Sequence, residues 1–328
     1  MIKFITLLLI ACSFGVHAAI PVSGSFEATQ TCPAYVSKNK KTNPDNLIVR
    51  PNQQYPMKEI NRNPPEWVRI EFPEVRHALR WVKANCGIME FNERDTNSCD
   101  DNAGMADSYV LALSSQSGFC ETYGFEAGKP ECRKLTKDSY QANHLTLHGL
   151  WPNQNNCGQN YGYCGVKPRA NHCDYIPLDL SNDVSIELKK LMPSYNYGSC
   201  LERHEWYKHG TCQTLGADDY FSLAMRLTME MDTSLFGRYL TAHKGETVKL
   251  SVLRELIAKD FGKNNAGKIY LGCKEGKLVD VFIELPALIP FNESLDSLIN
   301  KAPVYQYHDS CNNNVTISNF NKDSWFQD

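Results

Sequence analysis

The chain has 328 residues, of which 37 are acidic and 34 basic, and its formal net charge is −3 with a pI near 6.3. This balance excludes a general electrostatic trap for nucleic acid, so any polyanionic substrate must be held by a local site. The length predicts one large domain plus a smaller one, and thirteen cysteines predict a disulfide-rich exported protein.

The first residues predict an export signal. Lys3 precedes an apolar run from Phe4 to Val16, and cleavage is expected after Ala18 or Ala19. Removing a signal peptide at 1–18 leaves twelve cysteines, an even number that favours disulfides over metal ligands. No other apolar run is long enough to cross a bilayer. We therefore expect a secreted or periplasmic protein without a membrane span.

Residues 20–104 carry the signs of a small β module. Pro and Asn turn signals separate short apolar strings at 47–49, 67–70 and 81–82. We expect this all-β module over 20–92, followed by a linker over 93–106 that is rich in Asn, Asp, Ser and Gly.

The order of these strings resembles the bacterial Src-homology-3-like module. That resemblance implies a role in attachment or substrate contact, and hence a surface ligand for the module. A stabilising extension of the main domain is the alternative. Cys32 and Cys86 bracket the segment and could close it.

The remainder, 107–328, predicts an α+β domain: an antiparallel sheet flanked by helices and held by disulfides. Alternating Leu145 and Leu147 indicate a strand that delivers His148 at its end, with Pro152 stopping the strand. Other strands are expected at 109–113 and 278–285, and helices at 183–191, 218–231 and 251–260.

The densest group of titratable residues lies at 204–212. On a helical projection, His204, Glu205, Lys208 and His209 share one face, while two aromatic residues lie outside it. A solvated amphipathic helix is the simplest interpretation. A zinc site is disfavoured because a five-residue step turns the two imidazoles apart by about 140° on an α-helix. We expect no metal and no cofactor.

Two separated histidines suit acid–base chemistry on a phosphodiester. A 2′-hydroxyl must lose a proton as it attacks phosphorus, and the departing 5′-oxygen must gain one. His148 and His209 can do both near neutral pH. Lys208 and His204 can stabilise the charge that accumulates on the phosphoryl oxygens.

Two segments carry a specific resemblance: Leu147-His148-Gly149-Leu150-Trp151-Pro152, and His204-Glu205-Trp206-Tyr207-Lys208-His209-Gly210-Thr211-Cys212. They look like the two active-site segments of the ribonuclease T2 family, and the resemblance covers about residues 105–328. It does not cover the N-terminal region.

The resemblance implies a role for each matching residue. His209 would be the general base and His148 the general acid, with the two exchanging roles when water opens a 2′,3′-cyclic phosphate. Glu205 and Lys208 would stabilise the transition state, and His204 would bind the phosphate. It also implies the disulfides Cys173–Cys212 and Cys273–Cys311.

The resemblance further implies a base pocket. Trp151 matches the family's base-stacking residue, and Tyr161 or Tyr163 would complete the pocket. Some members have Asp directly after Trp-Pro, whereas this chain has Asn153. Because an amide both donates and accepts hydrogen bonds, base preference cannot be carried over.

The sequence thus predicts a monomeric, metal-independent endoribonuclease of low base specificity that cleaves single-stranded RNA through a cyclic phosphate to 3′-phosphate ends. The main alternative is a catalytically silent binding protein on the same fold. A second alternative makes the N-terminal module the principal function.

Overall fold

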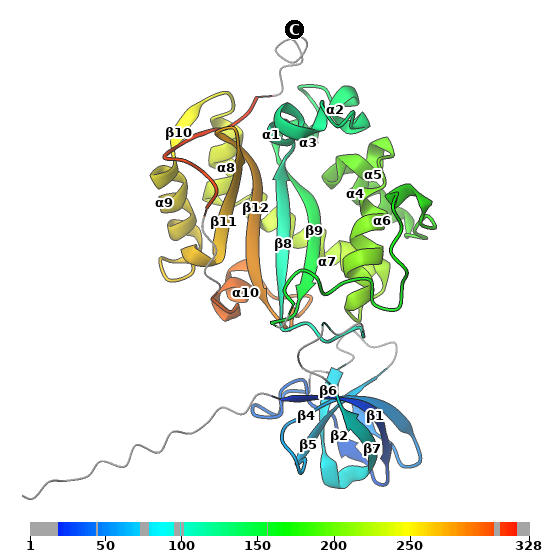
Figure 1. Ribbon diagram of the computed structural model, residues 1–328. Coiled ribbons are helices and arrows are strands. Elements are labelled where there is room, and N and C mark those ends of the chain that lie inside the picture. Colours follow the sequence, from blue (N-terminus) through cyan, green and yellow to red (C-terminus); the bar gives the residue numbers. More distant parts are fainter. Residues whose placement is uncertain are drawn as a thin grey trace, which may run out of the picture. The chain divides into compact units, whose positions relative to one another are not determined.

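The computed structural model describes residues 19–43, 45–72, 79–94, 99, 102–155, 157–304 and 309–319. The chain forms two compact units, 1–96 and 97–328, each with its own core (Figure 1). The expected signal segment and part of the expected linker lie outside the described residues. No helix in the described ranges is both long and apolar enough to cross a membrane.

The N-terminal unit is built of strands, apart from one short 3₁₀ turn, η1 (Ala84–Cys86). The predicted apolar strings lie on β3, β5 and β6. Five strands pair antiparallel in the order β6-β5-β4-β1-β7, and β2 pairs with β3. The bounds are β1 (Ile20–Ala28), β2 (Cys32–Pro33), β3 (Ile48–Val49), β4 (Gln54–Ile60), β5 (Trp67–Glu71), β6 (Leu79–Lys83) and β7 (Gly87–Glu93).

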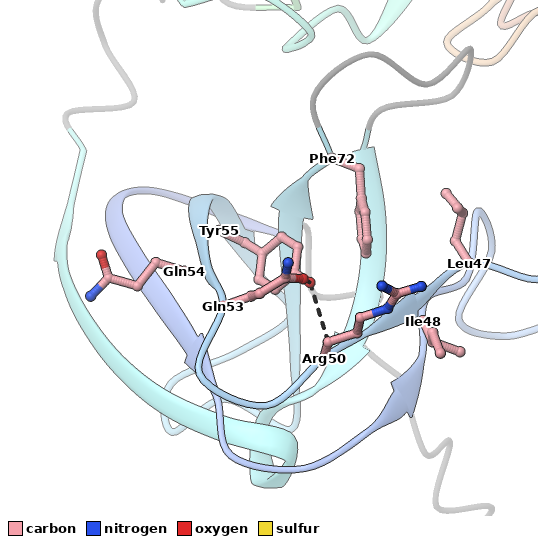
Figure 2. A pocket seen from close by; sticks show the side chains of 7 residues that line it. All are labelled: Leu47, Ile48, Arg50, Gln53, Gln54, Tyr55 and Phe72. Carbon is pink, nitrogen blue, oxygen red and sulfur yellow. Dashed lines mark hydrogen bonds between the residues drawn. The ribbon is translucent and has the colours of Figure 1, made fainter.

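A pocket of about 390 Å³ opens on this unit between the 47–50 segment and β4 (Figure 2). The Gln53 N–H donates to the Arg50 carbonyl at 3.2 Å and so closes the turn that forms one wall. Tyr55 and Phe72 supply aromatic rings with centroids 4.9 Å apart. Both rings belong to the buried core of the unit.

The second unit contains a six-stranded sheet, antiparallel except where β12 meets β13. The order is β10-β13-β12-β8-β9, and β11 pairs with β12. The strands predicted at 109–113 and 278–285 are β8 and β12, and the strand predicted to deliver His148 is β9. The bounds are β8 (Ser108–Ser115), β9 (Leu145–Asn153), β10 (Thr247–Lys249), β11 (Ile269–Lys274), β12 (Lys277–Pro286) and β13 (Asn314–Thr316).

Helices flank this sheet, which confirms the predicted fold class (Figure 1). The long helix α7 buries Phe221, Ala224 and Leu227 in the core that β8 and β9 share. The helices are α1 (Gln116–Phe119), α2 (Pro130–Lys134), α3 (Tyr140–Asn143), α4 (Asn182–Leu191), α5 (Pro193–Tyr197), α6 (Leu201–His204), α7 (Ala217–Asp232), α8 (Leu235–Ala242), α9 (Leu250–Phe261) and α10 (Leu295–Lys301). Shorter 3₁₀ or π turns are η2 (Cys120–Gly124), η3 (His172–Asp174), η4 (Glu205–His209), η5 (Gly210–Cys212) and η6 (Ala266–Lys268).

One boundary prediction is wrong. Pro152 does not stop β9, which continues to Asn153, so His148 lies in the middle of the strand. The reason is that β9 is an edge strand, which among the described residues pairs with β8 alone. At an edge, the N–H that proline lacks is not needed by a second neighbour.

Twelve cysteines form six disulfides, and one predicted pair is wrong. Cys173 pairs with Cys200, and Cys212 pairs with Cys164, so the expected Cys173–Cys212 bridge does not form. Cys273–Cys311 is present as expected, and Cys32–Cys86 closes the N-terminal unit. The other two bridges are Cys99–Cys157 and Cys120–Cys132.

Candidate active site

A β-bulge positions His148. Ala112 pairs with Gly149 and the next residue of β8, Leu113, pairs with Leu147, so His148 is the extra residue on β9. A bulge re-aims side chains locally, and such irregularities are common beside active sites. Gly149 is required by its surroundings, because a Cβ there would lie 1.8 Å from Glu205 Oε2.

A π-turn, not an α-helix, carries the second segment. The Gly210 N–H donates to the Glu205 carbonyl, five residues earlier, which is the π pattern. A π-turn has more residues per turn than an α-helix, so positions five apart come to one side. The rings of His204 and His209 therefore meet edge to face with centroids 5.9 Å apart. The prediction that the two imidazoles turn apart assumed an α-helix, so it is wrong for this π-turn.

Trp151 contacts His148, Glu205 and His209, which together with His204 and Lys208 form the candidate catalytic group. Its ring stacks near His209, with centroids 5.5 Å apart, and meets His148 edge to face at 5.2 Å. Its indole N–H donates to Glu205 Oε2 at 2.7 Å. The residue expected to stack a base is thus also a support that links both histidines to Glu205.

Tyr220 on α7 ties the two segments together. Its hydroxyl donates to the Leu150 carbonyl at 2.9 Å, and its ring meets Trp206 edge to face at 5.8 Å. Gly210 lets Trp206 pack closely, since a Cβ at Gly210 would lie 2.3 Å from the indole ring. One buried tyrosine therefore contacts both β9 and the π-turn.

The pKa values of the three histidines are lowered. Burial, together with the charges of Lys208 and Lys129, lowers the pKa of His148 to about 4. The pKa of His204 is lowered to about 3, and that of His209 is lowered well below 6.5. In both cases burial is the largest cause, and the charges of neighbouring groups come next. An anionic phosphate entering the site would oppose these shifts, because it favours the charged imidazole.

Glu205 is shifted in the opposite direction. Its side chain is fully buried, and burial raises its pKa to about 8, against the lowering effects of the Trp151 hydrogen bond and the Lys208 charge. A neutral carboxyl group can donate a hydrogen bond to a phosphoryl oxygen, whereas a carboxylate would repel it. The raised pKa thus makes Glu205 compatible with an anionic substrate.

Three buried polar atoms of the site make no hydrogen bond: His204 Nδ1, His209 Nδ1 and Glu205 Oε1. Glu205 Oε1 lies 3.8 Å from His148 Nε2, beyond hydrogen-bond distance. Unmade hydrogen bonds of buried groups cost about 1–3 kcal/mol each, so they mark a place that gains from a ligand. Ligand atoms of these three residues lie within 4.8 Å of one another, close enough to hold a metal ion. The absence of a metal stays a prediction.

A cavity of about 400 Å³ opens beside His148. The stacked rings of Phe119 and Tyr123 lie on one wall, with centroids 6.3 Å apart, and Lys129 and Asp280 add opposite charges. Burial raises the pKa of Asp280 to about 6, although the Ser114 hydroxyl donates to its carboxylate at 3.1 Å. This space is large enough to take a nucleotide next to His148.

The residues predicted to form the base pocket differ in their burial and contacts. Tyr161 is fully buried and accepts from the Met105 N–H at 3.1 Å, so it is part of a core cluster and cannot stack a base. Tyr163 is half-buried, and its N–H donates to the Lys208 carbonyl at 2.8 Å. Asn153 is buried at the end of β9 with its carboxamide oxygen unpaired. Tyr163 and Asn153 remain candidates.

His172 and Lys129 were missed by the sequence prediction. The His172 ring stacks on His204 with centroids 4.1 Å apart, and His172 and Lys129 line the cavity next to His148. Both come from irregular segments without a periodic pattern. Their only sequence signal is the presence of titratable side chains in long loops.

The chain matches known ribonucleases. A model described as the ribonuclease T2 family matches residues 106–289. Ribonuclease I of Escherichia coli K12 is 33% identical over 190 residues, which cover 52% of this chain and 71% of that protein. Ribonuclease T2 of Aspergillus oryzae is 25% identical over 205 residues, covering 56% of this chain and 68% of that protein. The self-incompatibility associated SF11-RNase of Nicotiana alata aligns with a TM-score of 0.45 and 20% identity over 64% of this chain and 98% of that one.

Proposed function

The chain belongs to the ribonuclease T2 family, and we propose that it is a metal-independent endoribonuclease that cleaves single-stranded RNA with low base specificity. The products would be 2′,3′-cyclic phosphates and then 3′-phosphates. Secretion or export to the periplasm and a monomeric state belong to the same proposal. The proposed export rests on the sequence of 1–18 and on the twelve paired cysteines.

In the first step His209 accepts the proton of the 2′-hydroxyl as that oxygen attacks phosphorus. The phosphorus–5′-oxygen bond breaks, and His148 donates a proton to the leaving oxygen. His209 suits the base role because its lowered pKa keeps it unprotonated. In the second step water attacks the cyclic phosphate and the two histidines exchange roles.

The phosphoryl group would lie against the π-turn. His204 and Glu205 would donate to its oxygens from the atoms that now lack partners. Lys208 would supply a positive charge, and its charge contributes to the lowered pKa values of His148, His204 and His209. Such fixed donors are effective because they do not reorganise during the reaction.

One observation carries the proposal. The bulge at His148 and the π-turn at Glu205–His209 bring an acid, a base and unpaired donors to one place, and Trp151 contacts all three. A catalytically silent protein on this fold would have no need to keep these buried groups unpaired. The alternative in which the N-terminal unit is the principal function predicts that removing the catalytic histidines leaves the biological role intact.

The test is cleavage of single-stranded RNA in excess chelator, with the product ends identified. We expect full activity, cyclic and then 3′-phosphate ends, and no cleavage of the matching DNA, which lacks the 2′-hydroxyl. DNA cleavage at a comparable rate, or loss of activity that returns with a divalent metal, would contradict the proposal. The second result would direct attention to His204, Glu205 and His209 as metal ligands.

A further inference from the structure

The N-terminal unit carries a loop with a local cluster of positive charge, although the chain as a whole is negatively charged. Lys38, Lys40 and Lys41 lie in a short loop closed by a β-bridge between Ser37 and Thr42. The Lys40 N–H donates to the Ser37 hydroxyl at 3.3 Å, which fixes the turn. Three cations thus share one ordered loop in a chain whose net charge is −3.

Aromatic rings lie beside this loop. Tyr35 enters the loop, forms a bridge with Trp81 on β6, and meets Trp67 on β5 with ring centroids 6.0 Å apart. Lys38 covers the Trp81 ring at 4.1 Å, and Lys83 lies 5.5 Å from the Trp67 ring. Trp67 and Tyr35 are only half-buried, so parts of both rings face solvent.

The lysines are the unneutralised charges of this face. Nearby acidic groups are already paired with arginines: Glu59 with Arg69, Asp45 with Arg80 and Glu66 with Arg62. Within the described residues, no ion pair involves Lys38, Lys40, Lys41 or Lys83. Lys38 lies over the Trp81 ring, so Lys40, Lys41 and Lys83 are the exposed positive charges next to the half-buried Tyr35 and Trp67.

We propose that this lysine–aromatic face (Tyr35, Lys38, Lys40, Lys41, Trp67 and Lys83) binds single-stranded RNA. Lysines would contact phosphates, and the open faces of Trp67 and Tyr35 would stack unpaired bases. Proteins that bind single strands without sequence preference combine these two features. Because the aromatic rings can stack bases, this face should bind RNA in preference to a polyanion that has no bases.

The inference deepens the proposed function, because the bound strand would be the substrate RNA. A second binding surface on the same chain raises the affinity for strands long enough to engage both surfaces. A dinucleotide can contact only one of the two surfaces, so the second surface does not raise its affinity. The lysine–aromatic face should therefore lower KM for long RNA and leave dinucleotide cleavage unchanged.

The first experiment measures binding of the full chain to a 20-nucleotide 2′-O-methyl oligouridine, which cannot be cleaved, by fluorescence anisotropy at several salt concentrations. The test variant is Lys38→Ala/Lys40→Ala/Lys41→Ala. The matched control is Lys189→Ala/Lys259→Ala/Lys263→Ala, three exposed lysines of the catalytic unit that change net charge equally. We expect the test variant to bind about tenfold more weakly at low salt and to lose about 2 from the salt slope, at about 0.7 per phosphate contact.

The second variant tests the bases. Trp67→Ala should weaken binding about fivefold or more, and Trp67→Tyr should restore most of the loss, because stacking needs a ring. An outcome in which the two lysine triples weaken binding equally would overturn the proposal. So would dextran sulfate competing as well as RNA, with Trp67→Ala without effect; the face would then bind an anionic carbohydrate.

Cleavage separates this inference from the proposed function. If the wild-type protein fails to cleave RNA, the proposed function is wrong, whatever the anisotropy shows. If it cleaves and the lysine triple raises KM for long RNA with kcat and dinucleotide cleavage unchanged, both stand. If KM for long RNA is unchanged as well, the face does not serve the nuclease.

Discussion

The candidate catalytic group and the lysine–aromatic face both place charged side chains beside aromatic rings. They differ in how far those side chains are buried. Around Trp151, Glu205 and His209 are buried and His148 is half-buried; all three contact the Trp151 side chain and have shifted pKa values. On the N-terminal unit the charges of Lys40 and Lys41 are exposed and make no ion pair within the described residues. Chemistry on a phosphodiester requires fixed, desolvated groups, whereas holding a flexible strand requires accessible charge. Substitutions should therefore affect turnover in the first region and only affinity in the second.

The largest effects are expected from the two histidines. His148→Ala and His209→Ala should each lower kcat by about 10²–10⁴, the usual contribution of a positioned acid or base. The double variant should lose less than the product of the two, because the groups act as a unit. Single-turnover cleavage of a dinucleotide measures this. Fully additive losses would show that the two imidazoles act independently.

Gly149→Ala should come next, although it removes no catalytic group. The new methyl carbon would lie 1.8 Å from Glu205 Oε2 and 2.6 Å from the Trp151 indole nitrogen, so both must move. A displacement of about 1 Å at a reacting group can cost about 10² in rate. Gly267→Ala is the control, since nothing lies within 4 Å of its added carbon. Wild-type turnover in a folded Gly149→Ala protein would refute the role of the bulge.

The identities of these residues could be predicted from the sequence, but their arrangement could not. The motif residues could be predicted because acid–base chemistry requires particular side chains. The convergence of His204 and His209 depends on one inserted residue per turn, which a projection at 100° per residue cannot reveal. His172 reaches the site from a loop, and Cys173 pairs with Cys200 because tertiary packing, not spacing, selects partners. Edge position, a property of the whole sheet, explains why Pro152 does not end β9.

Trp151→Phe should have a moderate effect on kcat, unlike a residue that only stacks a base. The variant keeps a ring but loses the indole N–H that donates to Glu205 Oε2. Leaving that buried oxygen unpaired costs about 1.4 kcal/mol or more, which is roughly tenfold in rate if it falls on the transition state. Trp206→Phe, which removes an indole that packs on Tyr220, is the control. A change in KM alone would restore the simpler stacking role.

The pH profile should shift rather than collapse when Lys208 is removed. The general acid must be protonated, so kcat/KM of the free enzyme falls as pH rises above the pKa of His148, which is about 4. Wild-type activity should therefore favour acidic pH. The Lys208 charge lowers that pKa, so in Lys208→Ala the pKa rises and the falling limb moves to higher pH, at a lower absolute rate. A limb that stays in place would exclude this electrostatic coupling.

The smallest effect on turnover is expected from opening the disulfide of the N-terminal unit. Cys32 and Cys86 are 54 residues apart, and a bridge over a loop of this length contributes about 4 kcal/mol by the chain-entropy estimate. Cys32→Ala/Cys86→Ala should therefore lower the thermal midpoint of this unit. Dinucleotide cleavage should stay within about twofold of wild type, because each unit has its own core.

Opening Cys173–Cys200 should give the contrasting result. That bridge joins η3, which carries His172, to the residue that precedes α6 and the π-turn. Cys173→Ala/Cys200→Ala should release both ends of the His172–His204 stack and lower kcat for a dinucleotide. Calorimetry and dinucleotide kinetics on both double variants give four measurements. If the Cys32–Cys86 variant lost turnover as the Cys173–Cys200 variant does, the two units would be coupled, and the division between chemistry and strand binding would have to be abandoned.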